Sequence, residues 1–395
     1  MEINSRRTDF EVELERIEGA IAELELGALT LPIDSERATK FAYLLYQRAT
    51  LTGDLDGLGV VEAALNTAIR EIGSAGDLYL LKANLDFKLH RLADVARDLE
   101  LGRDLRDGLQ GRALQADLDF QEGRYEAARK GYEAVISDDL TWDNLARLAY
   151  LKSKMGDVAG AEQAYIEAED ELTAKEMRHY AWVELQRGVL NLRRGRYDQA
   201  QMHYQVADRA YSGYWLVEEH KAELLGAQGK FEEAVALYRK VIARVPRPEF
   251  QQALGELYAA MGQPAQAEPW YEKALTAYLE SARHGAVHYY HHLTDFYADV
   301  RRDGGEAVKW ARKDMELRRN FSTLAALAWA LYRAGEFAEA LETIDEAIAS
   351  GATDGQLFFQ AGMIHESAAR NGKGAQYLRM AAHINPYYEN FHVHR

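Results

Sequence analysis

The stretch FSTLAALAWALYRAGEFAEALETIDEAIASGA, residues 321–352, predicts two helices joined by a tight turn. In the first half, leucines recur at intervals of three and four residues, which places them on one helix face: Leu324, Leu327 and Leu331. Gly335 follows, and a residue without Cβ ends a helix at little cost. The second half carries its own apolar stripe, at Ala340, Ile344, Ala347 and Ile348. We expect Phe337 to fill the elbow between the two helices.

The same order of residues recurs along most of the chain. The glycine of the turn returns with spacings of 33, 39, 34 and 33 residues, at Gly123, Gly156, Gly195, Gly229 and Gly262. An alanine follows each turn at a fixed distance, at Ala128, Ala161, Ala200, Ala234 and Ala267. A tyrosine comes four residues after each alanine, at Tyr132, Tyr165, Tyr204, Tyr238 and Tyr271. This register predicts an all-α solenoid of about ten antiparallel helix pairs, in which each pair buries its apolar face against its neighbours.

Composition and charge narrow the classes of function. The 395 residues are 48% hydrophobic and 28% charged, which is ample for a folded core. The net charge of −16 disfavours nucleic acid and anionic membrane surfaces as partners, because both attract basic proteins. The chain has no cysteine, no apolar run of about 20 residues and a highly charged start, so we expect a cytoplasmic protein without disulfides.

Five segments differ in regularity. We expect an N-terminal amphipathic helix in 1–30, irregular repeats in 31–108, regular repeats in 109–281, C-terminal repeats in 282–386 and a tail in 387–395. The long spacing of 39 predicts an insertion near residues 169–175, and a second is expected near 280–287. In the repeat at 288–319, Arg302 stands where the turn glycine is expected.

The repeat pattern resembles that of tetratricopeptide repeat (TPR) proteins over about residues 38–386. The segments PEFQQALGELYAAMGQPAQAEPWYEKAL, LAALAWALYRAGEFAEAL, LFFQAGMIHESA and AAHINPYY are similar to a group of bacterial TPR proteins without an assigned enzymatic activity. The resemblance implies a right-handed solenoid that binds partners. It implies no catalytic residue and no cofactor, so we expect a scaffold and not an enzyme.

In this family, the first helix of each pair lines the concave face at positions 2, 5, 9 and 12. Those positions give our candidate peptide-binding residues, acidic in the middle of the chain and aromatic toward its end: Glu219, Glu223, Glu249, Glu256, Tyr289, His292, Phe296, Trp329, Tyr332 and Phe359. Such a surface suits a protein or peptide with basic and apolar residues. A second interpretation is that the aromatic residues pack inside the stack.

A carboxylate clamp is disfavoured. TPR proteins that hold the C-terminal carboxylate of chaperones place Lys and Asn at positions 5 and 9. The corresponding pairs in this chain are Ala113/Asp117, Ala146/Tyr150, Leu185/Val189, Glu219/Glu223, Gln252/Glu256 and Ala325/Trp329. None of these pairs is Lys/Asn, so we expect a different kind of ligand.

A histidine cluster at His284–His292 offers the alternative function. His288, His291 and His292 would share one side of a helix, at spacings that metal ligands use. This alternative is a metal-binding or enzyme-associated protein. No HExxH motif accompanies the cluster, and histidines at a helix start near an insertion are more often solvated or capping than metal ligands.

Both chain ends leave alternatives open. An apolar seam of about two heptads runs along the N-terminal helix, at Phe10, Leu14, Ile17, Ile21 and Leu24. This seam can cap the first repeat or form a homodimer contact. The aromatic tail 387–395 can cap the last helix or dock in the groove of the solenoid.

Overall fold

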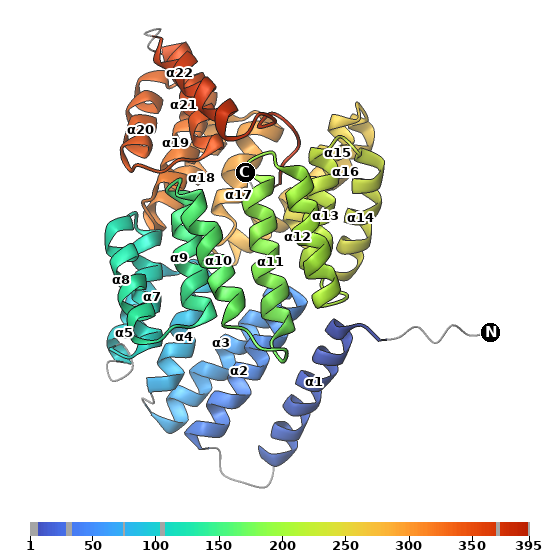
Figure 1. Ribbon diagram of the computed structural model, residues 1–395, viewed down its shortest axis with the longest axis vertical. Helices are drawn as coiled ribbons and strands as arrows, with labels where there is room; N and C mark the ends of the chain where they lie inside the picture. The colour runs from blue at the N-terminus through green and yellow to red at the C-terminus, as the bar shows by residue number, and fades with distance from the viewer. Residues whose placement is uncertain (1–6, 29–33, 74–75, 103–106, 369–371, 394–395) are drawn as a thin grey trace, which may run out of the picture.

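The computed structural model describes residues 7–28, 34–73, 76–102, 107–368 and 372–393. Within these ranges all regular secondary structure is helical (Figure 1). Helix α1 (Asp9–Ala28) is followed by ten pairs of helices joined by short turns, which we number 1 to 10. The prediction of an all-α solenoid of about ten antiparallel helix pairs is confirmed.

The helix bounds follow the predicted register. Pairs 1 to 4 are α2 (Ser35–Thr52) with α3 (Leu55–Ile72), α4 (Gly76–Lys88) with α5 (Leu92–Leu101), α7 (Leu109–Gln121) with α8 (Tyr125–Asp138), and α9 (Trp142–Lys154) with α10 (Val158–Asp170). Pairs 5 to 7 are α11 (Met177–Leu192) with α12 (Tyr197–Ala210), α13 (Trp215–Ala227) with α14 (Phe231–Arg244), and α15 (Pro248–Ala260) with α16 (Pro264–Arg283). Pairs 8 to 10 are α17 (Tyr290–Asp295) and η1 (Phe296–Arg301) with α18 (Gly304–Leu317), α19 (Phe321–Ala334) with α20 (Phe337–Ala349), and α21 (Gly355–Ala368) with α22 (Lys373–Ile384).

Within a pair, a glycine of the first helix makes room for a large side chain of the second. A Cβ atom at Gly188 would lie 2.2 Å from the ring of Tyr204, and one at Gly255 would lie 2.7 Å from the ring of Tyr271. Tyr204 is fully buried, and the register alanine Ala200 beside it is fully buried too. The repeated tyrosines and alanines are therefore core residues, because they set how closely the two helices approach.

The solenoid is wound so tightly that successive turns of the superhelix touch. The turn of pair 3 at Gly123 lies against Arg319 and Asn320, which precede pair 9. The turn of pair 4 at Gly156 lies against Thr353, which precedes pair 10. Contact thus recurs after six pairs, and the C-terminal helices α19–α22 lie directly above α7–α10 in Figure 1.

These contacts satisfy backbone groups that a helix leaves open. The last carbonyl groups of a helix have no partner within it. In four first helices, a donor from the next superhelical turn or from the tail binds such a carbonyl: Trp215 Nε1 to Leu51 O (2.8 Å), Asn320 Nδ2 to Gln121 O (2.9 Å), Thr353 N to Lys154 O (3.1 Å) and Asn390 Nδ2 to Ala227 O (2.9 Å). Stacking of the turns therefore caps helix ends as well as burying surface.

The elbow residue is buried only where another turn covers it. Tyr125 of pair 3 is 8% exposed, and its hydroxyl accepts a hydrogen bond of 2.8 Å from the backbone amide of Phe321. Phe337 of pair 9 has the same position but is 44% exposed. Phe337 still packs against Tyr332 across its elbow, with ring centroids 5.9 Å apart, but among the described residues no further helix pair covers its outer side.

In two turns of the described ranges another residue stands where a glycine is expected, and this residue still adopts the left-handed backbone conformation that favours glycine. Arg302 (φ 56°) follows the π-helix η1, and His90 (φ 61°) joins α4 to α5. Left-handed backbone is costly for such side chains, so the surrounding structure must hold them there.

Extra residues lie near both predicted insertions. They lengthen the loop between α10 and α11, and they extend helix α16 to 20 residues.

The seam of helix α1 is buried within this chain. Ile17 and Ile21 are buried, and Phe10, Leu14 and Leu24 pack against the same core as α2 and α3. At its start, the Phe10 amide donates a hydrogen bond of 3.2 Å to the carbonyl of Ser212, which precedes α13. Helix α1 thus covers pair 1, and its first turn also contacts the end of pair 5.

Candidate functional site: the inner wall and the C-terminal tail

The inner wall lines a partly open cavity of about 460 Å³ with polar and charged side chains along it, which we call the central cavity. The first helices α15, α17, α19 and α21 and the π-helix η1 form most of it. Lys154 and Arg193, at the ends of α9 and α11, close it from the turn below, and His392 and Val393 of the tail close another side. Four first helices therefore present the same face to one space, as the repeat register requires.

Charged groups of both signs line the central cavity. The carboxylates outnumber the lysine and arginine side chains by five to three: Glu249, Glu256, Asp295, Asp299 and Asp354 against Lys154, Arg193 and Arg302. The basic side is balanced locally, because Asp354 Oδ2 lies 4.0 Å from Lys154 Nζ and 3.8 Å from Arg193 Nη1. Burial lowers the pKa of Lys154, whereas the cations lower that of Asp354 despite its burial. Two of the other carboxylates also have a basic neighbour: Glu249 lies beside Arg247 and Asp295 beside His291.

The C-terminal tail docks on the inner wall of pair 6. The Val393 amide donates a hydrogen bond of 2.9 Å to Glu223 Oε1, and Asn390 Nδ2 donates one of 2.9 Å to the Ala227 carbonyl. Between them, the Phe391 ring lies where a Cβ atom on Gly226 would come within 2.4 Å of it. The tail therefore runs from α22 back across the solenoid to α13 (Figure 1).

Two tyrosines fasten the start of the tail on both sides of the groove. The ring of Tyr387 stacks on Tyr197 of pair 5, with centroids 5.2 Å apart. The ring of Tyr388 lies 5.3 Å from Phe359 of pair 10. The tail thus bridges the last pair to pairs 5 and 6. Residues 387–393 therefore do both things that the sequence left open: they cover the last helix pair and they lie in the groove. Residues 394 and 395 lie outside the described ranges.

The acidic candidates lie in three different settings. Glu249 and Glu256 line the central cavity. Glu223 binds the tail. Glu219 is fully buried, where its Oε1 accepts a hydrogen bond of 2.9 Å from the Tyr238 hydroxyl and its Oε2 lies 2.9 Å from His220 Nδ1. Glu219 therefore holds the two helices of pair 6 together.

The aromatic candidates form packed clusters. Phe296 is fully buried and Tyr289 is 5% exposed, and both pack around Tyr278. Trp329 is 7% exposed and donates from Nε1 to Asp299 (3.1 Å). Its ring stacks on Tyr332 and lies near Phe359, which contacts the tail. Of the ten candidates, Glu223 and Phe359 contact the tail, and Glu249, Glu256 and His292 line the cavity.

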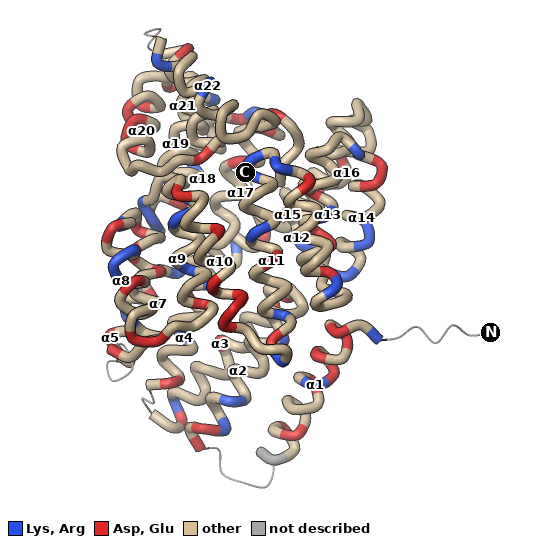
Figure 2. The backbone as a smooth tube through the Cα atoms, viewed as in Figure 1, with Lys and Arg blue, Asp and Glu red and all other residues tan. Residues whose placement is uncertain are grey.

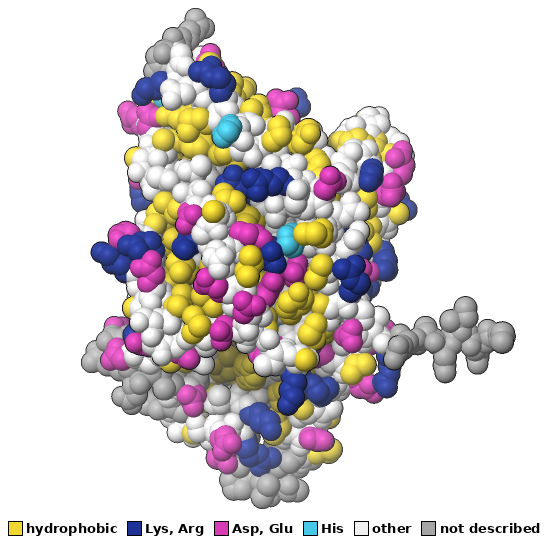
Figure 3. All heavy atoms as spheres, in the orientation of Figure 1, with side chains coloured by type: hydrophobic (Ala, Val, Ile, Leu, Met, Phe, Trp, Pro, Cys, Tyr) yellow, Lys and Arg dark blue, Asp and Glu magenta, His cyan; other side chains and the backbone are white. Residues whose placement is uncertain are grey.

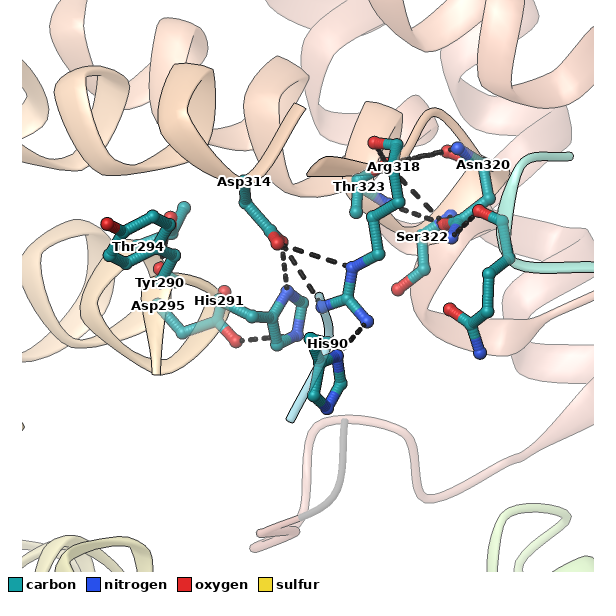
Figure 4. A network of polar contacts seen from close by, with 11 residues as sticks. His90, Tyr290, His291, Thr294, Asp295, Asp314, Arg318, Asn320, Ser322 and Thr323 are labelled. Atoms are coloured by element: carbon teal, nitrogen blue, oxygen red, sulfur yellow. Dashed lines mark hydrogen bonds and ion pairs between the residues drawn. The ribbon is translucent and has the colours of Figure 1, made fainter. Parts of the chain in front are cut away.

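The histidine cluster belongs to a contact between superhelical turns (Figure 4). His291 Nε2 lies 3.3 Å from Asp295 and its Nδ1 lies 3.7 Å from Asp314. Asp314 accepts a hydrogen bond of 3.2 Å from Arg318 Nε, and Arg318 Nη1 lies 2.7 Å from Nδ1 of His90 in pair 2. This network connects the turn of pair 2 to pair 8, six pairs later.

Protonation in this network follows from burial and charge. Asp295 raises the pKa of His291. Burial, together with the charge of Arg318, lowers the pKa of His90 to about 3. Burial alone would raise the pKa of Asp314, but His291 and Arg318 outweigh it and lower the value to about 2. His90 is therefore neutral near pH 7 and accepts the hydrogen bond from Arg318, whereas Asp314 is ionised.

The alternative metal site has no support in the described ranges. The rings of His288 and Tyr289 pack together with centroids 4.0 Å apart, and His292 stacks on Tyr278 at 5.6 Å. No group of three His, Asp or Glu side chains within those ranges is placed to hold a metal ion. The histidine rings instead pack on neighbouring rings: His288 and His292 both contact Tyr289, and His291 contacts His292.

The outer surface has a mixed character. In Figure 3 hydrophobic, basic and acidic side chains are interspersed on the visible face. Figure 2 shows an acidic stretch at the end of α10, which contains Glu167, Glu169 and Asp170. Arg187 of the following helix binds Glu169 and Glu162 of α10, at 2.9 and 2.6 Å.

None of the helices in the described ranges has both the length and the apolarity that a bilayer crossing demands.

Several residues of the site were missed from the sequence. Lys154, Arg193 and Asp354 enter the central cavity from helix ends, outside the inner positions of the repeat register. The tail residues Asn390 and Phe391 carried only a compositional signal, since YYENFHVHR is rich in aromatic residues. Contacts between residues more than 150 positions apart leave no periodic trace in one sequence.

Fold and site define a helical-repeat scaffold of the kind that binds other proteins. Two family models described as tetratricopeptide repeat match residues 221–282 and 322–346. These two segments are therefore tetratricopeptide repeats, and the other helix pairs of the described ranges follow the same register of helix, turn and helix.

Comparisons with known structures and sequences add three similar folds. A tetratricopeptide repeat protein from Parabacteroides merdae is 15% identical, with 78% of this chain and 98% of that chain covered and a TM-score of 0.37. The APC/C hetero-tetramer Cut9–Hcn1 is 12% identical, with 95% of this chain and 79% of that chain covered and a TM-score of 0.45. The human IFIT1 dimer with PPP-AAAA is 12% identical, with 93% of this chain and 94% of that chain covered and a TM-score of 0.49. No curated protein matches the chain in sequence.

Proposed function

We propose that this protein is a non-enzymatic scaffold that binds an extended segment of a partner protein on the inner wall of pairs 5, 6 and 10. One observation carries the proposal: Glu223, a predicted inner-wall residue, accepts the backbone amide of Val393 from the chain's own tail. A side chain that binds a main-chain amide can hold an extended segment of any sequence, because every residue except proline carries this amide. The same wall can therefore hold a segment from another chain.

The tail indicates the chemistry that this wall selects. Its contacts are an asparagine amide on the free carbonyl of a helix end, an aromatic ring over Gly226, and tyrosines against Tyr197 and Phe359. Buried aromatic residues supply much of the binding energy at protein interfaces. We therefore infer a partner segment with one or two aromatic residues. It would lie close to the cavity that Glu249 and Glu256 line.

Other expectations from the sequence remain part of this proposal: a bacterial, cytoplasmic protein without nucleic-acid or membrane partners. A homodimer through α1 would have to use the outer face of that helix, where Val12 and Leu26 are exposed, because Ile17 and Ile21 are buried against pair 1.

Competition with the tail tests the proposal. The probe is a fluorescein-labelled peptide of residues 387–395, added to the full-length chain and to its N390A/F391A variant. The tethered tail acts at a high effective concentration, so the wild-type chain should bind the probe weakly and the variant about tenfold more tightly. An E223Q substitution in the variant should weaken binding again. If the variant does not bind the probe, or binds it equally well with E223Q, the proposal is wrong.

A further inference from the structure

We propose that another cavity, formed mainly by pairs 4, 5 and 10, binds a phosphate group. This cavity has a volume of about 240 Å³ and adjoins the central cavity, with which it shares Lys154, Arg193 and Asp354. We call it the basic pocket. The site does not depend on the proposed function, because its wall contains neither Glu223 nor a described residue of the tail 387–393.

Positive charge exceeds negative charge on the wall of the basic pocket. Its lysine, arginine and acidic side chains are three cations and one carboxylate: Lys154, Arg193 and Arg194 against Asp354. With Lys154 protonated, three charges against one leave an excess of two positive charges. A phosphate monoester carries a charge of about −1.5 to −2 near pH 7, so it matches this excess better than a carboxylate does.

The single carboxylate, Asp354, does not take up the donors of the cations beside it. Its Oδ1 accepts hydrogen bonds from the backbone amides of Gln356 and Leu357 (2.9 and 3.2 Å) at the start of α21. Its Oδ2 lies 4.0 Å from Lys154 Nζ and 3.8 Å from Arg193 Nη1, which is too far for a hydrogen bond. Asp354 therefore offsets charge in the pocket without binding these N–H groups.

The ammonium group of Lys154 lies in a largely apolar setting. Its side chain is 13% exposed, and Nζ lies 5.7 and 6.0 Å from the ring centres of Tyr150 and Phe321. Burial and the charge of Arg193 lower the pKa of Lys154. Nζ donates no hydrogen bond to another described residue. An anion within hydrogen-bond reach would stabilise the charged form of such a lysine.

Arg194 and two neutral side chains complete the set of donors. Arg194 is partly buried, and burial and the nearby Arg196 lower its pKa, whereas Asp354 raises it. The amide of Gln186 and the hydroxyl of Tyr150 belong to the same wall. A guanidinium group offers a fork of N–H donors that fits two phosphate oxygens, and lysine binds phosphate as a point charge. The basic pocket thus combines the donor types that phosphate sites in proteins use.

Calorimetry on the full-length chain, in a buffer without phosphate or sulfate, tests the proposal with separate probes. They are inorganic phosphate, Nα-acetyl-O-phospho-L-serine amide and the unphosphorylated Nα-acetyl-L-serine amide. Both phosphate probes should bind, and the serine probe should bind about tenfold more weakly or less, since it cannot form a charge-assisted hydrogen bond. Tighter binding of the phosphoserine probe assigns the pocket to a phosphorylated residue, and tighter binding of inorganic phosphate assigns it to the free ion.

Two substitutions with opposite effects connect the binding to the basic pocket. R194Q removes one cation and should weaken the binding of both phosphate probes about tenfold. D354N removes the carboxylate but keeps a side-chain oxygen that can cap α21, so it should strengthen the binding several-fold. Damage to the fold would not produce such a gain. R209Q is the matched control, because Arg209 is exposed on α12 and does not line the pocket.

Three results would overturn the proposal. The first is that neither phosphate probe binds. The second is that Nα-acetyl-L-aspartic acid amide binds as tightly as the phosphoserine probe, because a carboxylate would then serve equally well. The third is that R194Q and D354N both leave the affinities unchanged. The labelled tail peptide binds through Glu223 and Phe391, so the proposed function and the phosphate site can fail separately.

Discussion

The backbone amide of Val393 donates a hydrogen bond of 2.9 Å to Oε1 of Glu223, across 170 residues of sequence. This bond joins the end of the chain to the first helix of pair 6. It places tail residues beside a polar cavity that four first helices and η1 share. The inner wall of the solenoid is thus partly occupied by the chain's own tail.

A double-mutant cycle tests how the tail is held. In G226A the new methyl group would meet the Phe391 ring at 2.4 Å and Leu257 at 3.1 Å, so the tail should leave the wall although alanine favours the helix. Chymotrypsin should then cleave at Tyr387, Tyr388 and Phe391 several-fold faster than in the wild type.

The second arm of this cycle is F391A, which removes the ring. The G226A/F391A chain should be more stable than the sum of the single variants predicts, because the clash is gone. Strict additivity of the two free-energy changes would show that Phe391 does not lie over Gly226.

Stacking of the superhelical turns can be measured at two equivalent glycines. Gly123 and Gly229 have nearly the same backbone (φ 77° and 75°), but a Cβ atom at Gly123 would lie 2.6 Å from the Arg319 carbonyl, whereas one at Gly229 meets nothing within 4 Å. G229A should cost about 1–2 kcal/mol of unfolding free energy, the strain of left-handed backbone alone. G123A should cost about 1–3 kcal/mol more, in the range of overpacking. Urea unfolding measures both, and equal losses would contradict contact between the turns.

Acid should weaken the contact between pairs 2 and 8. Burial lowers the pKa of His90 from an ordinary value of 6.5 to about 3, and that of His288 to about 4. Between these values the unfolded chain binds more protons than the folded chain, so stability is complete above pH 6.5 and falls as the pH drops toward 4. Each group contributes a slope of at most about 1.4 kcal/mol per pH unit.

The groups that face His90 are Arg318, Asp314, His288 and His292. Asp314, with its pKa lowered to about 2, loses its contribution only at still lower pH. H90N keeps a residue that tolerates left-handed backbone but does not titrate. Its urea midpoint should fall less steeply between pH 6.5 and 4 than that of the wild type, and an unchanged slope would show that His90 is protonated in the folded chain.

Trp329 and Phe337 should differ strongly in their effect on stability. Trp329 is 7% exposed and its indole N–H binds Asp299, so W329A should cost about 3–5 kcal/mol. Phe337 lies in the same helix pair but is 44% exposed, so the F337A substitution should lower the free energy of unfolding by less than about 1 kcal/mol. Thermal unfolding compares the two. A small effect of W329A would identify its ring as available to a partner and not part of the core.

Much of the fold could be predicted from short-range pattern. Leucines spaced by three and four, glycines at turns, and the alanine and tyrosine register predict each helix pair, because a repeat packs mainly on its sequence neighbours. The inner positions of α15 were also predicted, and Glu249 and Glu256 do line the cavity. His90 was not recognised as a turn residue, since a left-handed histidine has no glycine to mark it.

The sequence by itself determined the helix pairs, their register and the face that each first helix turns inward, since all of these depend on residues within about 40 positions of one another. Only the tertiary structure decided that the turns of the superhelix touch after six pairs, that Tyr125 is covered and Phe337 is not, and that the tail lies on Glu223. The reason is geometric: small rotations between successive pairs add up over six repeats, and their sum decides which distant surfaces meet.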